Sequence, residues 1–153
     1  MGKRFLLLGA GLVVLAQVVP VERANPEINS SRTVEAKLEV PPAVDNVLVR
    51  SCYDCHSQRT AWPWYSRVAP SSWLVAHDVS EARRKLNFSD WASYNQKQAE
   101  RKLGAICEEV KGGDMPLWYY TPMHPGTKLS EAERQAVCQW AEAAQNSLRA
   151  QSQ

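Results

Sequence analysis

The chain opens with a continuous apolar stretch. Residues 5–19 are apolar except for Gln17, and Lys3 and Arg4 precede them. A basic start followed by such a stretch is typical of a secretory signal. As a helix the stretch measures ~22 Å, which is less than the ~30 Å hydrocarbon core of a bilayer. We therefore expect residues 1–24 to be a signal peptide or an N-terminal membrane anchor. An ordinary buried helix is the alternative.

If the segment directs export, Lys3 and Arg4 stay on the inner side of the membrane and the rest of the chain lies outside the cytoplasm. The cleavage signal is weak, and only Ala24 is a fair candidate. Residues 25–40 are polar and lack periodicity, which indicates a linker or an extended strap.

Four or five helices are expected after this linker, and no segment alternates as a half-buried strand does. The fifth is a short turn at Asp90 and Trp91, capped by Ser89. Helices are expected from Pro42 into Cys52, from Ser71 or Ser72 to about Leu86, from about Gln96 to Lys111, and from Ser130 onward. Their apolar faces include Val44, Val47, Leu48, Leu103, Ile106, Val110, Val137, Ala141, Ala144 and Leu148. Ser130 and Glu133 form a capping box, and a pair of glycines follows Lys111.

Two loops rich in proline and aromatic residues separate these helices, over residues 57–70 and 114–129. Structureless loops of this length are unusual in a compact domain unless something anchors them. The expected fold is mostly α: a small helical domain over residues 41–150, with long loops around a ligand and a hydrophobic helix before it.

The strongest chemical signal is the sequence Cys-Tyr-Asp-Cys-His at residues 52–56, which has the spacing of a c-type haem attachment site. Two thiols three residues apart at a helix end can add across the two vinyl groups of one porphyrin. His56 then offers an imidazole nitrogen to the iron. We expect one covalent haem c on Cys52 and Cys55, with His56 as the proximal ligand.

Other uses of the two cysteines fit the sequence less well. A thioredoxin-like dithiol would be expected near a βαβ unit, and no such pattern is visible. A zinc site needs a second pair of ligands at metal spacing. The net charge of +2 lies wholly within the first 24 residues, so the neutral remainder gives no general attraction for nucleic acid.

The ligand on the other side of the iron decides between electron transfer and ligand binding. A methionine ligand raises the potential and suits electron transfer, whereas an open face suits gas or peroxide chemistry. Met115 is the preferred candidate because it lies in a loop just past a helix end, before a proline that keeps its backbone extended. Met123, His77, His124 and a vacant position are the alternatives.

Several other residues are candidates for supporting roles. Haem is a flat apolar disc, and four tryptophans lie in or beside the two loops: Trp62, Trp64, Trp73 and Trp118. Ordinary packing explains each one equally well. Arg59 and Arg67 could pair with propionates, although surface solvation is the better explanation for each. Cys107 and Cys138 fall on the inner sides of the last two helices and are expected to form a disulfide in an oxidising compartment.

The chain resembles the bacterial haem-binding domain family, small proteins related to single-haem c-type cytochromes. The resemblance covers about residues 25–140. It rests on Ser-Cys-Tyr-Asp-Cys-His-Ser at 51–57, Trp-Pro-Trp-Tyr-Ser at 62–66, Leu-Asn-Phe-Ser at 86–89, Cys-Glu-Glu-Val at 107–110, and Met-Pro at 115–116. It implies covalent haem on Cys52 and Cys55, ligation by His56 and Met115, and an extracytoplasmic domain often held by an N-terminal segment.

The expected function is electron transfer by a single-haem c-type cytochrome, periplasmic, secreted or anchored to the inner membrane, with unidentified redox partner proteins and no enzymatic activity. The main alternative is a gas or redox sensor, or a haem-binding module, with an open distal site. A haem peroxidase is a weaker alternative because no distal His–Arg pair is evident.

Overall fold

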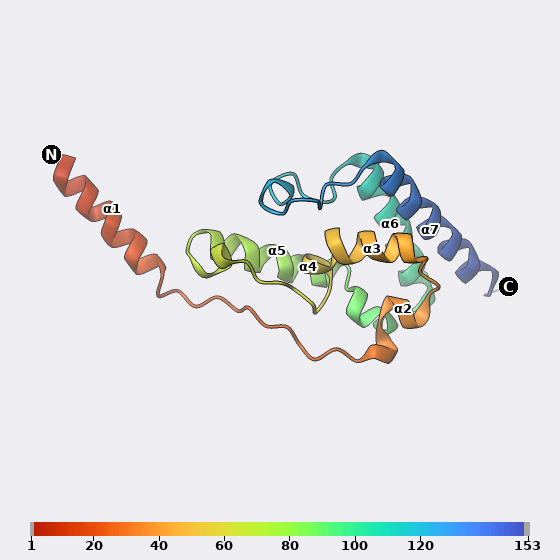
Figure 1. The fold of residues 1–153 in the computed structure, drawn as a ribbon. Coiled ribbons are helices and arrows are strands. Elements are labelled where there is room, and N and C mark those ends of the chain that lie inside the picture. The colour runs from red at the N-terminus through yellow and green to blue at the C-terminus, as the bar shows by residue number, and fades with distance from the viewer. Residues whose placement is uncertain (1, 152–153) are drawn as a thin grey trace.

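The computed structural model describes residues 2–151, and this part of the chain is mostly helical with no β-strand (Figure 1). Its α-helices are α1 (Gly2–Ala16), α2 (Val34–Lys37), α3 (Pro42–Ser51), α4 (Tyr53–His56), α5 (Ser71–Lys85), α6 (Gln96–Gly112) and α7 (Glu131–Ala150). Its 3-10 helices are η1 (Ser30–Arg32), η2 (Trp64–Arg67), η3 (Phe88–Ser93) and η4 (Thr121–Met123). The expected helical fold class is therefore confirmed.

The core lies where α3, α6 and α7 meet. Helices α6 and α7 lie side by side, and α3 packs against α7. Leu48, Leu103 and Val137 come from the three helices and are at most 1 % exposed. These are the residues that the apolar periodicity placed inside, because burying one face of each helix removes the most apolar surface from water.

The helix ends follow local side-chain chemistry. The capping box of α7 is confirmed: the Ser130 side chain accepts the Glu133 N–H, and the Glu133 carboxylate accepts the Ser130 N–H. A second capping box, formed by Asn95 and Gln98, begins α6 and was not predicted. Helix α6 ends at Gly112 and is capped by Gly113, whose φ of 80° lies in the left-handed region that glycine adopts without strain.

The segment expected to be a linker is partly folded. Helices η1 and α2 form within it, and Val34 is fully buried in the core. Glu35 accepts a hydrogen bond from the Tyr53 hydroxyl at 2.8 Å. An isolated apolar residue gives no periodic signal, so the sequence pattern did not reveal that residues 33–37 pack onto the domain.

Helix α1 stands apart from the rest of the molecule, and a long extended segment joins it to η1 (Figure 1). Its large apolar side chains are exposed; those of Phe5, Leu8 and Leu15, for example, are between 64 and 71 % accessible. Among residues 2–151, no helix combines the length and the apolar character needed to cross a membrane. Lys3 and Arg4 were expected to stay on the inner side of the membrane. Their side chains lie outside the described part of the structure.

Candidate haem site

The junction of α3 and α4 positions the attachment motif. Helix α3 ends at Ser51, and Cys52 turns the chain into the single turn of α4. The Cys52 carbonyl accepts the N–H of Cys55 at 3.2 Å and that of His56 at 2.8 Å. One helical turn therefore holds both cysteines and the histidine, as the spacing of the motif requires.

The orientation and tautomer of His56 are set by α5. Its Nδ1 lies 3.1 Å from the carbonyl oxygen of Leu86, just past the end of that helix. A carbonyl can only accept, so Nδ1 carries the proton and Nε2 keeps its lone pair. Burial lowers the pKa of His56, which favours the neutral ring. The expected backbone partner of His56 is thus confirmed, and Nε2 is the nitrogen available to a metal.

The two cysteines of the motif are free thiols. Burial raises the pKa of Cys52 and of Cys55 to about 12, and neighbouring negative charges act in the same direction. Both side chains are therefore protonated at neutral pH, and both are half-buried at the edge of open space.

Three adjoining hollows surround this motif. The first, of about 350 Å³, has Cys55 in its wall and is lined mainly by apolar side chains of the two loops and α5. The second, of about 260 Å³, is bordered by Cys52, Cys55 and His56. The third, of about 270 Å³, continues past Cys52 and His56 into the core. Cofactor sites are mostly apolar clefts of several hundred Å³, so the space fits a group the size of haem.

The lining of the three hollows distinguishes between the candidates for the second iron ligand. Met115 is half-buried and lines the second and third hollows, both of which also contain His56. Of these three hollows, His77 lines only the second, and its side chain is exposed. Met123 is 55 % exposed and lines the first hollow, whose wall does not include His56. The geometry therefore favours Met115.

His124 is committed to other partners. Its Nδ1 donates to the carbonyl of Tyr120 at 2.9 Å, so its Nε2 accepts from the Tyr65 hydroxyl at 3.2 Å. Its ring also stacks on that of Tyr120, with the centroids 3.8 Å apart. Both nitrogens are occupied, and neither is free to bind iron.

Tyr120 connects this cluster to the attachment motif. Its hydroxyl donates to Asp54 Oδ2 at 2.9 Å, and Asp54 Oδ1 accepts the N–H of Ala61 at 3.0 Å. Burial and the nearby carboxylate raise the pKa of Tyr120, so its hydroxyl stays protonated and can donate. Asp54, Tyr120, His124 and Tyr65 thus form a clasp that joins both loops to α4. Sequence reasoning missed this clasp because its members lie up to 70 residues apart without a shared spacing.

The loop bearing Met115 is fixed at its start by α6. The carbonyl of Glu109 accepts the N–H of Asp114 at 3.0 Å and that of Met115 at 3.2 Å. Arg134 of α7 donates to the carbonyl of Val110 at 2.7 Å. Orphan carbonyls at the end of α6 are therefore satisfied, and Met115 leaves the helix in a defined direction.

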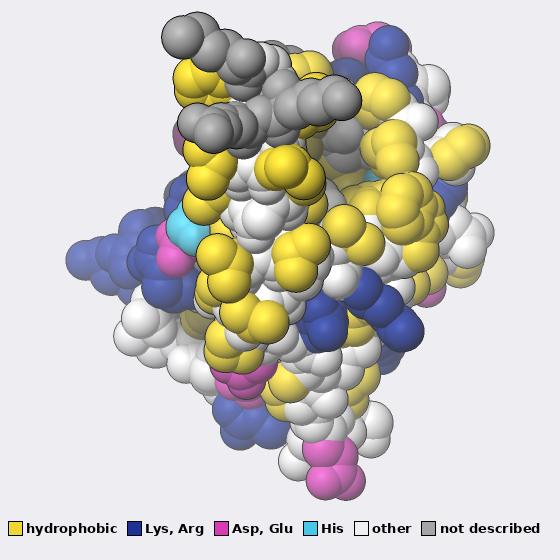
Figure 2. Space-filling view, turned by 90° about the vertical axis from the view of Figure 1, so that its left-hand side faces the viewer, with side chains coloured by type: hydrophobic (Ala, Val, Ile, Leu, Met, Phe, Trp, Pro, Cys, Tyr) yellow, Lys and Arg dark blue, Asp and Glu magenta, His cyan; other side chains and the backbone are white. Residues whose placement is uncertain are grey.

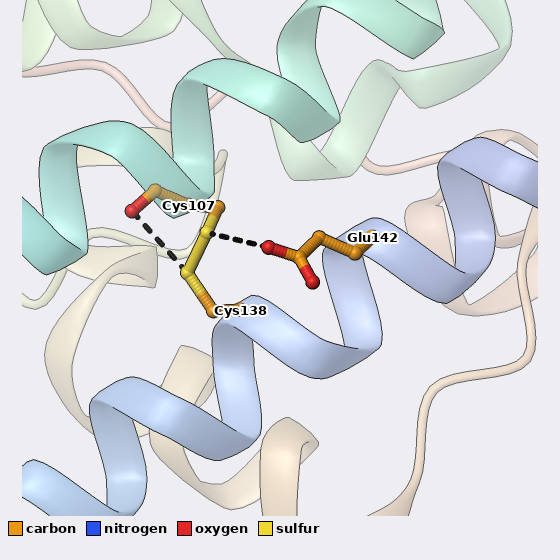
Figure 3. A group of neighbouring side chains, drawn as sticks. All are labelled: Cys107, Cys138 and Glu142. Atoms are coloured by element: carbon orange, nitrogen blue, oxygen red, sulfur yellow. Dashed lines mark hydrogen bonds between the residues drawn. A yellow bond between two sulfur atoms is a disulfide. The ribbon is translucent and has the colours of Figure 1, made fainter.

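A disulfide between Cys107 and Cys138 joins α6 to α7 (Figure 3). The carboxylate of Glu142 lies 3.5 Å from the Cys107 sulfur. These three residues are the one group of possible metal ligands found among the described residues. Sulfurs bonded to each other are not thiolates, so the oxidised pair offers no ordinary metal site. The disulfide instead fastens both ends of the segment that contains Met115.

The four candidate tryptophans do not converge on one pocket. Trp64 lines the first hollow but is 73 % exposed, and Trp118 is 80 % exposed. Trp62 and Trp73 line a separate hollow between α5 and the segment after α1. Nearness to the loops in the sequence makes these tryptophans candidates for the pocket, but their side chains line different hollows or are exposed. The tryptophans that are buried, Trp91 and Trp140, belong to the core.

The positive charges around the hollows do not come from Arg59 or Arg67, in agreement with the preferred explanation that these two side chains are solvated at the surface. Arg59 pairs with Glu35 at 3.4 Å, and Arg67 lines none of the three hollows. Among the described residues that line them, Lys85 and Lys102 are the only Lys or Arg, and both border the third hollow. Sequence spacing gave no signal for this pair, because they come from α5 and α6.

Comparison with known families agrees with the geometry. The model of a haem-binding domain family matches residues 11–143, so the chain belongs to this family. The resemblance stated from the sequence motifs is thereby confirmed, and the cofactor that the family binds is haem. No curated protein and no solved structure matches the chain significantly.

Proposed function

We propose that the protein is a single-haem c-type cytochrome with a cytochrome c-like domain that transfers electrons. Cys52 and Cys55 hold the haem covalently, and each thiol adds across one vinyl group, so that its sulfur bonds to one vinyl carbon and its hydrogen is added to the other. Bound haem supplies a one-electron Fe(III)/Fe(II) couple. The remaining chemistry belongs to the chain: ligation, exclusion of water and neutralisation of charge.

The observation that carries the proposal is the orientation of His56. Its Nδ1–H is held by the Leu86 carbonyl, which leaves Nε2 beside the hollows bordered by both free cysteines. Metal-binding histidines generally have their second nitrogen fixed in this way, because the hydrogen bond sets the ring orientation and increases its basicity.

Met115 is proposed as the second ligand. It shares two hollows with His56, it is half-buried against the core, and its backbone is fixed by the end of α6. A methionine ligand favours the reduced state and suits electron transfer without a change of ligation. Lys85 and Lys102 provide the cations that haem carboxylates need when they are partly removed from water.

The attachment is tested with cysteine variants. The wild-type protein should keep its haem through acid–acetone extraction and show the intact mass of the chain plus one haem. Cys52→Ala or Cys55→Ala should leave a single thioether, and the double variant should lose all haem on extraction. Extraction of haem from the wild-type protein would contradict the proposal.

Electron transfer itself is tested by a redox titration of the haem-loaded protein. The proposal predicts one reversible one-electron transition, with the same ligands in both oxidation states. A large hysteresis, or binding of exogenous ligands in one oxidation state, would instead favour the sensor or peroxidase alternatives, because both need an open distal position.

We further propose that the domain works outside the cytoplasm, periplasmic and held at the inner membrane by its N-terminal segment, with protein redox partners. The basic, apolar start of the chain supports export. A disulfide is the state expected of Cys107 and Cys138 in an oxidising compartment.

A further inference from the structure

We propose that the haem-binding domain rests on a lipid bilayer through its first aromatic loop, with α1 retained as part of the folded molecule. The contact surface is an apolar patch formed by Trp64, Val68, Trp73 and Leu74. Trp64 and Leu74 also line the first hollow, so the patch borders the haem site, whereas Val68 and Trp73 do not line it. The inference rests on the proposed attachment through the N-terminal segment, and it can fail without affecting haem attachment or electron transfer.

The segment after α1 is pinned to the loop by hydrogen bonds. Gln17 pairs with Ala69 as a strand partner would: its Oε1 accepts the Ala69 N–H at 2.9 Å, and its Nε2 donates to the Ala69 carbonyl at 3.3 Å. Arg23 donates to the Ser66 carbonyl at 2.9 Å. These two residues therefore fix the end of α1 beside η2.

Asn25 and Arg83 extend this attachment. Asn25 donates to the Thr60 carbonyl at 2.9 Å and accepts from the Trp62 indole at 3.2 Å. Arg83 of α5 donates to Asn25 Oδ1 at 2.9 Å and to the Ala24 carbonyl at 2.8 Å. Cleavage after Ala24 would remove the contacts of Gln17 and Arg23 with the loop. The matched family region also begins within α1, at residue 11.

The apolar patch lies next to Ser66 and Ala69, the loop residues to which Arg23 and Gln17 are hydrogen-bonded. Its members are between 40 and 73 % exposed, and Val68 directly precedes Ala69, the partner of Gln17. Helix α1 carries exposed apolar side chains from Phe5 to Leu15. Viewed from the end at which α1 lies, the molecule presents extensive hydrophobic surface with Lys and Arg side chains beside it (Figure 2).

The charge distribution selects lipid as the occupant. Residues 57–77 contain no Asp or Glu, and residues 5–21 contain no charged side chain at all. Of the two arginines in residues 57–77, Arg59 is paired with Glu35, and Arg67 is exposed next to Val68 of the patch. A face with tryptophans, aliphatic residues and a cationic margin is the composition of a membrane interface, where indole rings lie at the headgroups and cations attract anionic lipids. A helix that is apolar on all sides is better suited to the interior of a bilayer than to an amphipathic groove on a protein.

The geometry then defines the orientation of the domain. Because Gln17 ties α1 to the patch, entry of α1 into the bilayer brings Trp64 and Trp73 to its surface. Cys55 of the attachment motif lines the same hollow as Trp64 and Leu74, so this edge of the haem site would lie close to the membrane surface.

The test uses the full-length, haem-loaded protein. Its intact mass is measured first, and residues before Gln17 are expected to be present. The protein is then placed in nanodiscs of phosphatidylcholine and phosphatidylglycerol and labelled with hydroxyl radicals. Trp64 and Trp73 should be labelled several-fold less in nanodiscs than in the lipid-free, haem-loaded protein. Labelling of Trp118, which belongs to the second loop and is 80 % exposed, should be the same in both.

A matched pair of variants locates the contact. Val68 is 46 % exposed in the patch, and Val49 is 50 % exposed on α3. Val68→Asp should restore labelling of Trp64 and Trp73, whereas Val49→Asp should leave them protected. A mature chain lacking Gln17 would overturn the inference, as would labelling of Trp64 and Trp73 that is the same in nanodiscs as in the lipid-free protein. Protection that depends on protein concentration would overturn it in favour of a second copy of the chain.

Discussion

At the scale of single residues, hydrogen bonds rather than sequence proximity define the site. His56 could be placed as a metal ligand from its motif, and even the type of its partner could be predicted, because a ligating imidazole needs a second anchor. That this partner is Leu86 depends on how α5 ends. The clasp around Asp54 and Tyr120 had no sequence signal at all.

The clasp leads to a prediction about stability. Tyr120→Phe removes the hydroxyl that donates to Asp54 and leaves a carboxylate oxygen without this partner. The free energy of unfolding should fall by about 1–2 kcal/mol, the usual range for a partly buried hydrogen bond to a charged group. The measurement is a urea titration of the haem-loaded protein followed by circular dichroism.

Tyr119→Phe is the matched control. Its hydroxyl donates to Asp78 at 3.0 Å, but the side chain is 36 % exposed and water can replace the bond. The loss should be ~0.5 kcal/mol or less. Equal effects of the two substitutions would show that the clasp has no special part in holding the loops.

At the scale of elements, the helices were the predictable part of the fold. The periodic faces of α3, α6 and α7 and the capping box at Ser130 are local properties, so a single sequence reveals them. The packing of Val34 and the directions of the loop tryptophans depend on contacts between distant segments, which periodicity does not encode.

The start of α7 gives a pH-dependent prediction. Backbone and side-chain hydrogen bonds from Ser130, with the Arg50 guanidinium 2.7 Å away, lower the pKa of Glu133 from 4.5 to about 2. A lowered carboxyl pKa stabilises the folded state above pH 4.5, and this contribution is lost as the pH falls towards 2. Glu133→Gln should reduce the unfolding free energy at neutral pH by about 0.5–1 kcal/mol.

Urea titrations at several pH values check this expectation. The difference between wild type and Glu133→Gln should shrink as the pH falls from 4.5 and vanish near 2. A constant difference across this range would mean that the negative charge of Glu133 does not contribute to the free energy of unfolding.

The disulfide gives a third prediction. The bond closes a loop whose ends are 31 residues apart. On the loop-entropy model, such a bond stabilises the folded state by about 3–4 kcal/mol. Cys107→Ala with Cys138→Ala should lower the unfolding free energy by about this amount, with the haem still attached. Denaturation of the double variant without reductant tests this, because reductant would also change the oxidation state of the iron. An unchanged midpoint would contradict a stabilising role.

At the scale of the whole molecule, the fold brings together groups from separate parts of the chain. The junction of α3 and α4 supplies the attachment residues, α5 orients His56, and α6 with its disulfide to α7 directs Met115. The motif alone predicted a c-type haem, but which methionine shares a hollow with His56 depends on this assembly. Lys85 and Lys102 are candidate partners of the haem carboxylates for the same reason: the fold brings them to one hollow.

The most direct measurement of the central claim is the optical spectrum of the reduced, haem-loaded protein with and without carbon monoxide, for the wild type and Met115→Ala. If His56 and Met115 both bind iron, the wild-type spectrum is unchanged by carbon monoxide, because no position is open. Met115→Ala should then bind the gas and shift its Soret band, while Met123→Ala should behave as the wild type does. A Soret shift in the wild-type protein would contradict the account, since the distal side would be open and electron transfer with fixed ligands excluded.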